Sequence, residues 1–242
     1  MNIDLVIFDK DGTLIDIDYY WGGMVRLRAE MLSKKYIEIH AQKKVANELM
    51  SDMGIDLNTG KIKQTGPVGI NPREVIIDIA CQTMRRYFGT ITIEQVSLVF
   101  QEIDIYSQTC LEKLVKPLPG VEELLARLKQ KKIKIAIATT DLTSRAKLAM
   151  DSIGLAHYFD DIAGSDMVDK AKPNPDLVNY LCKKLSSDKS RTLVIGDSIV
   201  DLKMAKLANV SFIGVKTGLH TPEFLENSEI LVDDLSNMGN IL

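Results

Sequence analysis

Several features that would assign a protein to a specialised class are missing from this sequence of 242 residues. It has only three cysteines, none in CxxC spacing, at positions Cys81, Cys110 and Cys182. This pattern is typical of reduced, buried thiols rather than of a disulfide framework or a zinc site. No apolar run is long enough to cross a bilayer, and Asp4 and Asp9 interrupt the apolar stretch that a signal peptide would need. We therefore expect a cytoplasmic protein that does not insert into a membrane.

A large excess of charge is also missing. The 30 Lys and Arg residues nearly balance the 33 Asp and Glu residues, and the net charge is −3. This balance does not favour nucleic acid as a partner. A hydrophobic content of 45% is enough for a full core, and the length fits one large domain or two modest ones.

Two parts of the chain, residues 1–15 and about 116–242, alternate short apolar runs with amphipathic helical segments. The apolar runs lie at residues 5–8, 133–138, 193–195, 211–215 and 230–232. Alternating strands and helices of this kind build a parallel sheet with helices on both faces. The sequence therefore predicts an α/β fold with a Rossmann-like, doubly wound parallel sheet.

The segment between these parts has a different pattern, with no comparable strand run. Helical periodicity covers about residues 23–53, 73–88 and 93–114, while residues 56–72 are rich in Gly, Asn and Thr and predict a loop. We therefore expect an α/β core domain at 1–17 and 115–242, interrupted by an all-helical domain at 18–114.

Two aspartates directly follow the first apolar run, Leu5–Phe8. If strand geometry continues past Phe8, Asp9 and Asp11 point to the same side and Lys10 points to the other. Open α/β sheets bind ligands at the carboxyl ends of their strands, and crowded carboxylates favour a cation or a shared proton. Asp and Gly after a strand can also form an ordinary turn.

Two further candidates follow later strands. Thr139 comes directly after the run that ends at Ala138, and its hydroxyl could donate to a phosphate oxygen or begin a helix. Lys172 lies in a segment that Pro173 and Pro175 keep from being helical. It precedes a predicted helix, which Asn174 would cap, in a region suited to anions. The alternative is a solvated surface lysine.

A second pair of carboxylates follows the run at 193–195. Asp197 lies at the strand end, and Asp201 comes four residues later on the same face of a helical turn. One carboxylate at a helix start is ordinary, whereas two favour a cation. Mg²⁺ is a hard cation that suits one or two carboxylates together with a substrate phosphate.

Together these elements resemble the four motifs of the haloacid dehalogenase superfamily. The motifs, in chain order, correspond to residues 9–14, Thr139, Lys172–Pro173 and 196–201. The closest general resemblance is to phosphoglycolate-phosphatase-like members, and the helical segment at 18–114 resembles their first-type cap.

The resemblance implies a Mg²⁺-dependent phosphatase. Its substrate would be a small phosphate monoester, phosphoglycolate or sugar-phosphate-like, cleaved through an aspartyl-phosphate intermediate. Two alternatives remain: a phosphomutase of the β-phosphoglucomutase type, and a non-catalytic phosphate-binding protein on the same fold. The implied partner is a small phosphorylated metabolite, and the protein would be a monomer or a homodimer.

The resemblance also assigns roles to residues. Asp9 would be the nucleophile and Asp11 the proton shuttle, with Thr139 and Lys172 completing the catalytic set. The phosphate would bind to these four residues together with Lys10 and Thr140. Mg²⁺ would bind to Asp9, the Asp11 backbone carbonyl and Asp197, with Asp201 in support. In the cap, Lys61, Lys63 and Arg73 are candidates for recognising the leaving group or are simply solvated charges.

Overall fold

A computed structural model describes residues 2–69, 71–219 and 230–240 of the chain. Its backbone contacts divide the chain into two compact units. One, here called the α/β unit, comprises Met1–Asp16 and Val115–Leu242, and the other, the helical unit, comprises Ile17–Leu114. Within the described residues, no helix combines the length and the apolar character that crossing a membrane requires.

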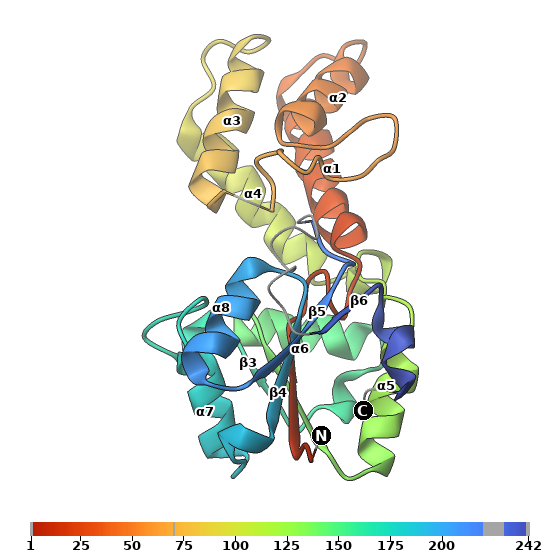
Figure 1. Ribbon diagram of the computed structural model, residues 1–242. Helices are drawn as coiled ribbons and strands as arrows, with labels where there is room; N and C mark the ends of the chain where they lie inside the picture. The colour runs from red at the N-terminus through yellow and green to blue at the C-terminus, as the bar shows by residue number, and fades with distance from the viewer. Residues whose placement is uncertain (1, 70, 220–229, 241–242) are drawn as a thin grey trace. The chain divides into compact units, whose positions relative to one another are not determined.

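The α/β unit contains a six-stranded sheet in the order β3-β2-β1-β4-β5-β6, and every neighbouring pair is parallel (Figure 1). The strands are β1 (Leu5–Phe8), β2 (Lys134–Ala138), β3 (Asp161–Ala163), β4 (Thr192–Gly196), β5 (Ser211–Val215) and β6 (Ile230–Val232). This confirms the predicted Rossmann-like α/β fold. Among the strands of the described residues, β3 alone was not predicted, because its apolar part is too short to form a recognisable run.

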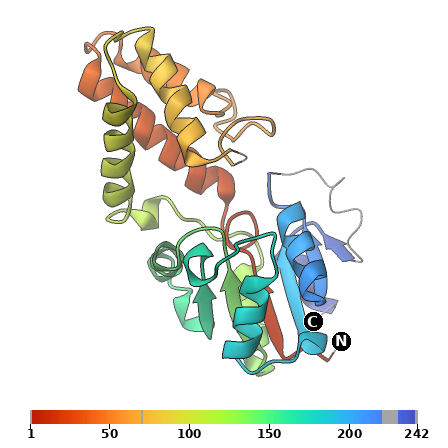
Figure 2. The same cartoon turned by 90° about the vertical axis from the view of Figure 1, so that its left-hand side faces the viewer.

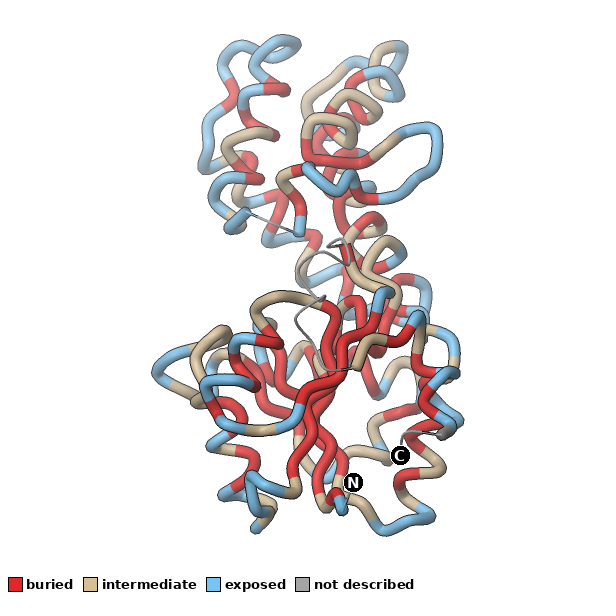
Figure 3. The backbone as a smooth tube through the Cα atoms, viewed as in Figure 1, coloured by how far each residue is buried: buried red, intermediate tan, exposed pale blue. Residues whose placement is uncertain are grey.

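Helices cover both faces of this sheet. They are α5 (Val121–Gln130), α6 (Thr143–Ser152), α7 (Asp176–Lys184) and α8 (Ile199–Ala208), with short 3₁₀ turns at Ala156–Tyr158, Ser165–Met167, Lys189–Arg191 and Leu235–Asn240. Helices α7 and α8 lie on one face, and α5 lies on the other (Figure 1). The strands between them form the most continuously buried part of the unit (Figure 3).

The helix α7 begins later than the sequence predicts. Asn174 was expected to cap it, but the N-cap residue is Pro175 and the helix starts at Asp176. The Asn174 side chain instead donates to the carbonyl of Ala171 at 3.0 Å. This hydrogen bond closes the loop that carries Lys172.

The helical unit consists of α1 (Ile17–Tyr36), α2 (Gln42–Asp52), α3 (Arg73–Arg85) and α4 (Ile93–Ser107), followed by a 3₁₀ turn at Leu111–Lys113 (Figure 2). The single helix predicted over 23–53 is wrong, because residues 37–41 separate α1 from α2. There the Gln42 side chain donates to the carbonyl of Ile37 at 3.0 Å. A capping box formed by Thr92 and Gln95 begins α4.

The strand order favours a ligand site beside β1. The chain runs from β1 to β2 and β3 on one side, and then crosses to β4 on the other side. In open α/β sheets, ligands bind outside the carboxyl ends of the strands at such a switch point. The loops after β1 and β4, which carry Asp9 and Asp197, meet there.

Two glycines with positive φ give a matched test of this packing. Gly120 has φ +78°, and a Cβ added to it would lie 2.1 Å from the Ser236 nitrogen. Gly154 has φ +72°, and nothing lies within 4 Å of its added Cβ. We expect Gly154→Ala to cost about 1–2 kcal/mol of unfolding free energy from backbone strain alone. Gly120→Ala should cost clearly more, because Ser236 must also move. Equal losses in chemical denaturation would contradict this packing.

Candidate active site

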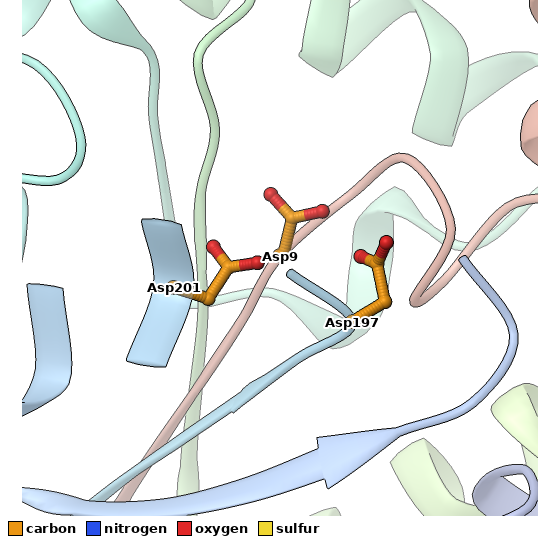
Figure 4. A group of neighbouring side chains, drawn as sticks. All are labelled: Asp9, Asp197 and Asp201. Carbon is orange, nitrogen blue, oxygen red and sulfur yellow. The ribbon is translucent and has the colours of Figure 1, made fainter. Parts of the chain in front are cut away.

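Three buried or nearly buried carboxylates converge at the carboxyl ends of β1 and β4. Asp9 follows β1 directly, Asp197 follows β4, and Asp201 lies in the first turn of α8. One oxygen of each lies within 4.8 Å of one oxygen of the other two (Figure 4). The Asp9 backbone N–H donates to the carbonyl of Ile195 at 2.9 Å, which fixes this residue to the end of β4.

One ammonium group lies among these carboxylates. Lys172 Nζ donates to Asp9 Oδ1 at 2.5 Å and to Asp201 Oδ1 at 2.6 Å. Burial lowers the pKa of Lys172, but the adjacent Asp201 and Asp9 carboxylates outweigh this effect and raise it above its usual value. Lys172 is therefore a protonated, buried cation rather than the solvated surface lysine considered from the sequence.

A single lysine does not balance three carboxylates. Burial, opposed by Lys172 and reinforced by the nearby Asp201 and Asp11 charges, raises the pKa of Asp9 from 3.8 to about 7. Burial and the charges of Asp9 and Asp201 raise the pKa of Asp197 well above its usual value. A proton or a bound cation is therefore needed to relieve the repulsion.

The carboxylate oxygens that accept no hydrogen bond from the protein are suitable ligands for a hard cation. Thr13 donates a hydrogen bond to Asp197 Oδ1 at 3.0 Å. Asp201 Oδ1 accepts a hydrogen bond from Lys172, and Asp201 Oδ2 accepts one from Ser198. Within the described part of the chain, the second oxygens of Asp9 and Asp197 accept no protein hydrogen bond. Carboxylate oxygens of this kind are ligands that Mg²⁺ takes in proteins. The donor set therefore fits Mg²⁺, with Asp201 in a supporting role.

Three supporting residues were not recognised as such from the sequence. A Cβ on Gly218 would lie 1.7 Å from Asp197 Oδ2, so the chain after β5 can approach this carboxylate only with glycine. Thr217 donates to the carbonyl of Gly12 at 2.6 Å. Thr13 bonds Asp197 and is fully buried. Thr13 belongs to the 9–14 motif, whereas residues 217–218 carry only the signal that they follow a strand.

The capping of α8 explains how Asp201 is held. Ser198 is the N-cap residue, and its side chain accepts a hydrogen bond from the Asp201 backbone N–H. In return, Asp201 Oδ2 accepts from the Ser198 backbone N–H at 3.2 Å. This is a capping box with Asp in the third helical position. Asp201 thus caps the start of α8 and is also one of the three clustered carboxylates.

The remaining predicted residues lie in a neighbouring network. The strand geometry expected past Phe8 ends at that residue, and the Asp11 carboxylate lies outside the group of three. It accepts instead from Lys10 Nζ at 2.9 Å. Lys10 is fully buried and also lies 3.3 Å from Asp141 Oδ2, so its ammonium group faces carboxylates. This placement does not support the predicted phosphate-binding role of Lys10.

The two threonines predicted to bind phosphate have different environments. Thr139 is buried, and its Oγ1 accepts from the Asp141 backbone N–H at 3.1 Å, so its own hydroxyl proton can be given to a ligand. Thr140 is exposed.

The cap candidates belong to the helical unit. Arg73 pairs with Asp104 at 2.6 Å, Lys63 donates to the Ser51 carbonyl at 2.9 Å, and Lys61 is exposed. A role for any of them in recognising the leaving group stays a prediction.

Known proteins resemble this chain along most of its length. The family model described as haloacid dehalogenase-like hydrolase matches residues 3–209. A protein of Dickeya dadantii (strain 3937) named "Probable phosphatase IndB" is 29% identical over 236 residues, which cover 97% of this chain and 91% of that protein.

Solved structures share the fold. The crystal structure of a predicted phosphoglycolate phosphatase from Haemophilus somnus has a TM-score of 0.72 at 20% identity, covering 100% of this chain and 98% of its own. That of β-phosphoglucomutase from Clostridium difficile has a TM-score of 0.64 at 21% identity, covering 99% and 94%. At these identities, the likeness establishes the fold alone.

The raised pKa of Asp9 predicts how stability depends on pH without metal. The folded protein holds a proton that the unfolded chain releases, so this contribution is complete below about pH 4 and is lost as the pH rises through about 7. In chelator, the wild-type protein should lose up to about 4 kcal/mol of unfolding free energy over this range relative to Asp9→Asn. Denaturation curves of the two proteins at a series of pH values would measure it. Parallel pH dependences would contradict the electrostatic account.

Proposed function

Because the chain belongs to the haloacid dehalogenase-like hydrolase family, we propose that it is a Mg²⁺-dependent phosphatase acting on a small phosphate monoester. The observation that carries this proposal is the environment of Asp9. Its carboxylate is partly accessible at the end of the central strand, next to a buried lysine and two further carboxylates. Such a group can attack phosphorus once positive charge balances the site.

The proposed reaction has two steps. In the first, an Asp9 oxygen attacks phosphorus in line, the bond from phosphorus to the ester oxygen breaks, and Asp11 protonates the departing alkoxide. In the second, Asp11 takes a proton from a water molecule that attacks the aspartyl-phosphate. Inorganic phosphate leaves and Asp9 is restored.

Two residues would bind the phosphoryl group during these steps. The Lys172 ammonium already bonds Asp9 Oδ1 and supplies a point charge beside the attacking group. The Thr139 hydroxyl would donate to a phosphoryl oxygen.

The metal would be held by Asp9 and Asp197 with the backbone carbonyl of Asp11, while Asp201 supports them. Bound Mg²⁺ supplies the positive charge that lets a dianionic phosphate approach a carboxylate. Thr13 orients Asp197 for this purpose through its 3.0 Å hydrogen bond.

Phosphoglycolate and sugar phosphates are the substrate classes that we propose. The predicted phosphoglycolate phosphatase from Haemophilus somnus shares the fold over 100% of this chain, which motivates the first class. A phosphomutase would use the same Asp9 and Asp11 but return the phosphoryl group to a sugar. A requirement for a bisphosphate activator would identify that activity, whereas steady release of inorganic phosphate would support the phosphatase.

Replacing the proposed nucleophile tests the reaction. We expect Asp9→Asn to reduce Mg²⁺-dependent release of phosphate from p-nitrophenyl phosphate by at least about 10³-fold, while the fold is retained. The matched control is Asp233→Asn, which removes an exposed aspartate paired with Lys216 in the same unit and should leave the rate unchanged. Substantial turnover by the folded Asp9→Asn protein would rule out Asp9 as the nucleophile.

The buried partner of Asp197 gives a separate test of the metal site. Thr13→Val keeps the side-chain volume but removes the hydrogen bond to Asp197. Loss of such a partner typically lowers metal affinity about 10- to 100-fold, and we expect a weakening in this range for Mg²⁺ measured by titration calorimetry. Unchanged affinity in the folded variant would show that Thr13 does not orient a metal ligand.

A further inference from the structure

One buried cation in the α/β unit has no task in the reaction proposed above. The side chain of Lys10 is 0% exposed, and its Nζ lies 2.9 Å from Asp11 Oδ1 and 3.3 Å from Asp141 Oδ2. Lysine is among the residues least often buried, because desolvating its ammonium group is costly unless carboxylates compensate. The contacts of Lys10 with Asp11 and Asp141 therefore compensate for the cost of burying its ammonium group, and we ask what these contacts do for the site.

The two contacts of Lys10 join two loops that carry predicted catalytic residues. Asp11 follows β1, and Asp141 follows β2. Asp141 in turn donates its backbone N–H to Thr139 Oγ1 at 3.1 Å. The carboxylate of Asp141 also lies 3.7 Å from Arg145 Nε in α6. The Lys10 ammonium group thus links the loop that carries Asp11 to the loop that carries Thr139. Asp141 is its contact in the second loop.

We propose that Lys10 is a positioning residue that orients the Asp11 carboxyl group for proton transfer to the leaving group. The inference rests on the proposed phosphatase function. A lysine ammonium can only donate, so Lys10 holds Asp11 Oδ1 as an acceptor and leaves Oδ2 as the oxygen that can exchange a proton with the substrate. Among the described residues, Oδ2 of Asp11 has no hydrogen-bond partner. It is therefore the oxygen available to the substrate.

This arrangement uses Asp11 Oδ1 to accept from Lys10 and leaves Oδ2 for both proton transfers. Asp11 Oδ2–H gives its proton to the departing alkoxide as the bond from phosphorus to that oxygen breaks. The same oxygen later takes a proton from the water that attacks the Asp9 phosphoryl group, which restores the starting state. Without Lys10, the carboxyl group could rotate and offer either oxygen, so proton transfer would lose its fixed geometry.

The leaving group separates this role from a merely structural one. p-Nitrophenolate departs without a proton, whereas an alkoxide needs one. The value of kcat/KM covers the steps only up to release of the leaving group, so it excludes the second half of the reaction. A positioning role predicts a loss confined to alkyl esters. General loss of folding or of Mg²⁺ would lower both values together.

The test compares two substrates in four variants. Values of kcat/KM are measured for p-nitrophenyl phosphate and for whichever of phosphoglycolate, glycerol phosphate and glucose phosphate the wild-type protein cleaves fastest. Lys10→Met removes the donor at similar length, and Lys10→Arg keeps a donor. Lys10→Met leaves Asp11 without its ammonium partner and leaves Asp141 with Arg145 at 3.7 Å as its charged partner. A Lys10→Met and Asp141→Asn double variant therefore guards against misfolding. The control is Lys184→Met, which removes an exposed lysine paired with Asp161.

We expect the Met variants to lose about 10²-fold on the alkyl ester and less than about tenfold on p-nitrophenyl phosphate. Lys10→Arg should recover much of the alkyl activity, and Mg²⁺ affinity by calorimetry should stay near that of the wild type. Equal losses on both substrates in the folded double variant would overturn the positioning role alone. No turnover of any monoester by the wild-type protein would overturn the proposed function and this inference with it.

Discussion

The repulsion among Asp9, Asp197 and Asp201 is the constraint on which the rest of the site depends. Parallel strands bring their carboxyl ends to one edge of the sheet, so the fold itself forces the residues after β1 and β4 together. Burial strengthens this repulsion, and Lys172 compensates only part of it. The folded protein therefore has a place for added positive charge at the edge of its central strand.

The crowding of the carboxylates is sterically possible because glycines, which have no Cβ, lie next to them. Gly12 and Gly218 lie where a Cβ would collide with the Asp197 carboxylate, and a Cβ at Gly196 would lie 2.5 Å from that of Asp201. Hydrogen bonds from Thr13 and Ser198 then fix the orientation of the two carboxylates. Loops after β1, β4 and β5 thus share one site, and a buried sheet provides the stability that offsets its electrostatic cost.

The sequence predicted the parts of this arrangement that follow from periodicity. Alternating strands and helices gave the sheet, and the positions of Asp9 and Asp197 after apolar runs placed both at its edge. The sequence did not predict the features that depend on tertiary contacts. The contacts of Lys10 depend on the end of strand geometry at Phe8, and the approach of Gly218 depends on a loop after β5. Neither leaves a pattern in the residues themselves. Strand β3 was not predicted because only two of its three residues, Ile162 and Ala163, are apolar.

The central claim is that Asp9 carries the phosphoryl group during turnover. Acid quenching during steady-state cleavage of p-nitrophenyl phosphate with Mg²⁺, followed by peptide mass spectrometry, tests it most directly. The account predicts one added phosphoryl group on the peptide that contains Asp9, formed with substrate and lost when substrate is exhausted. A phosphoryl group on another side chain, or turnover with no trapped adduct on this peptide at any quench time, would contradict it.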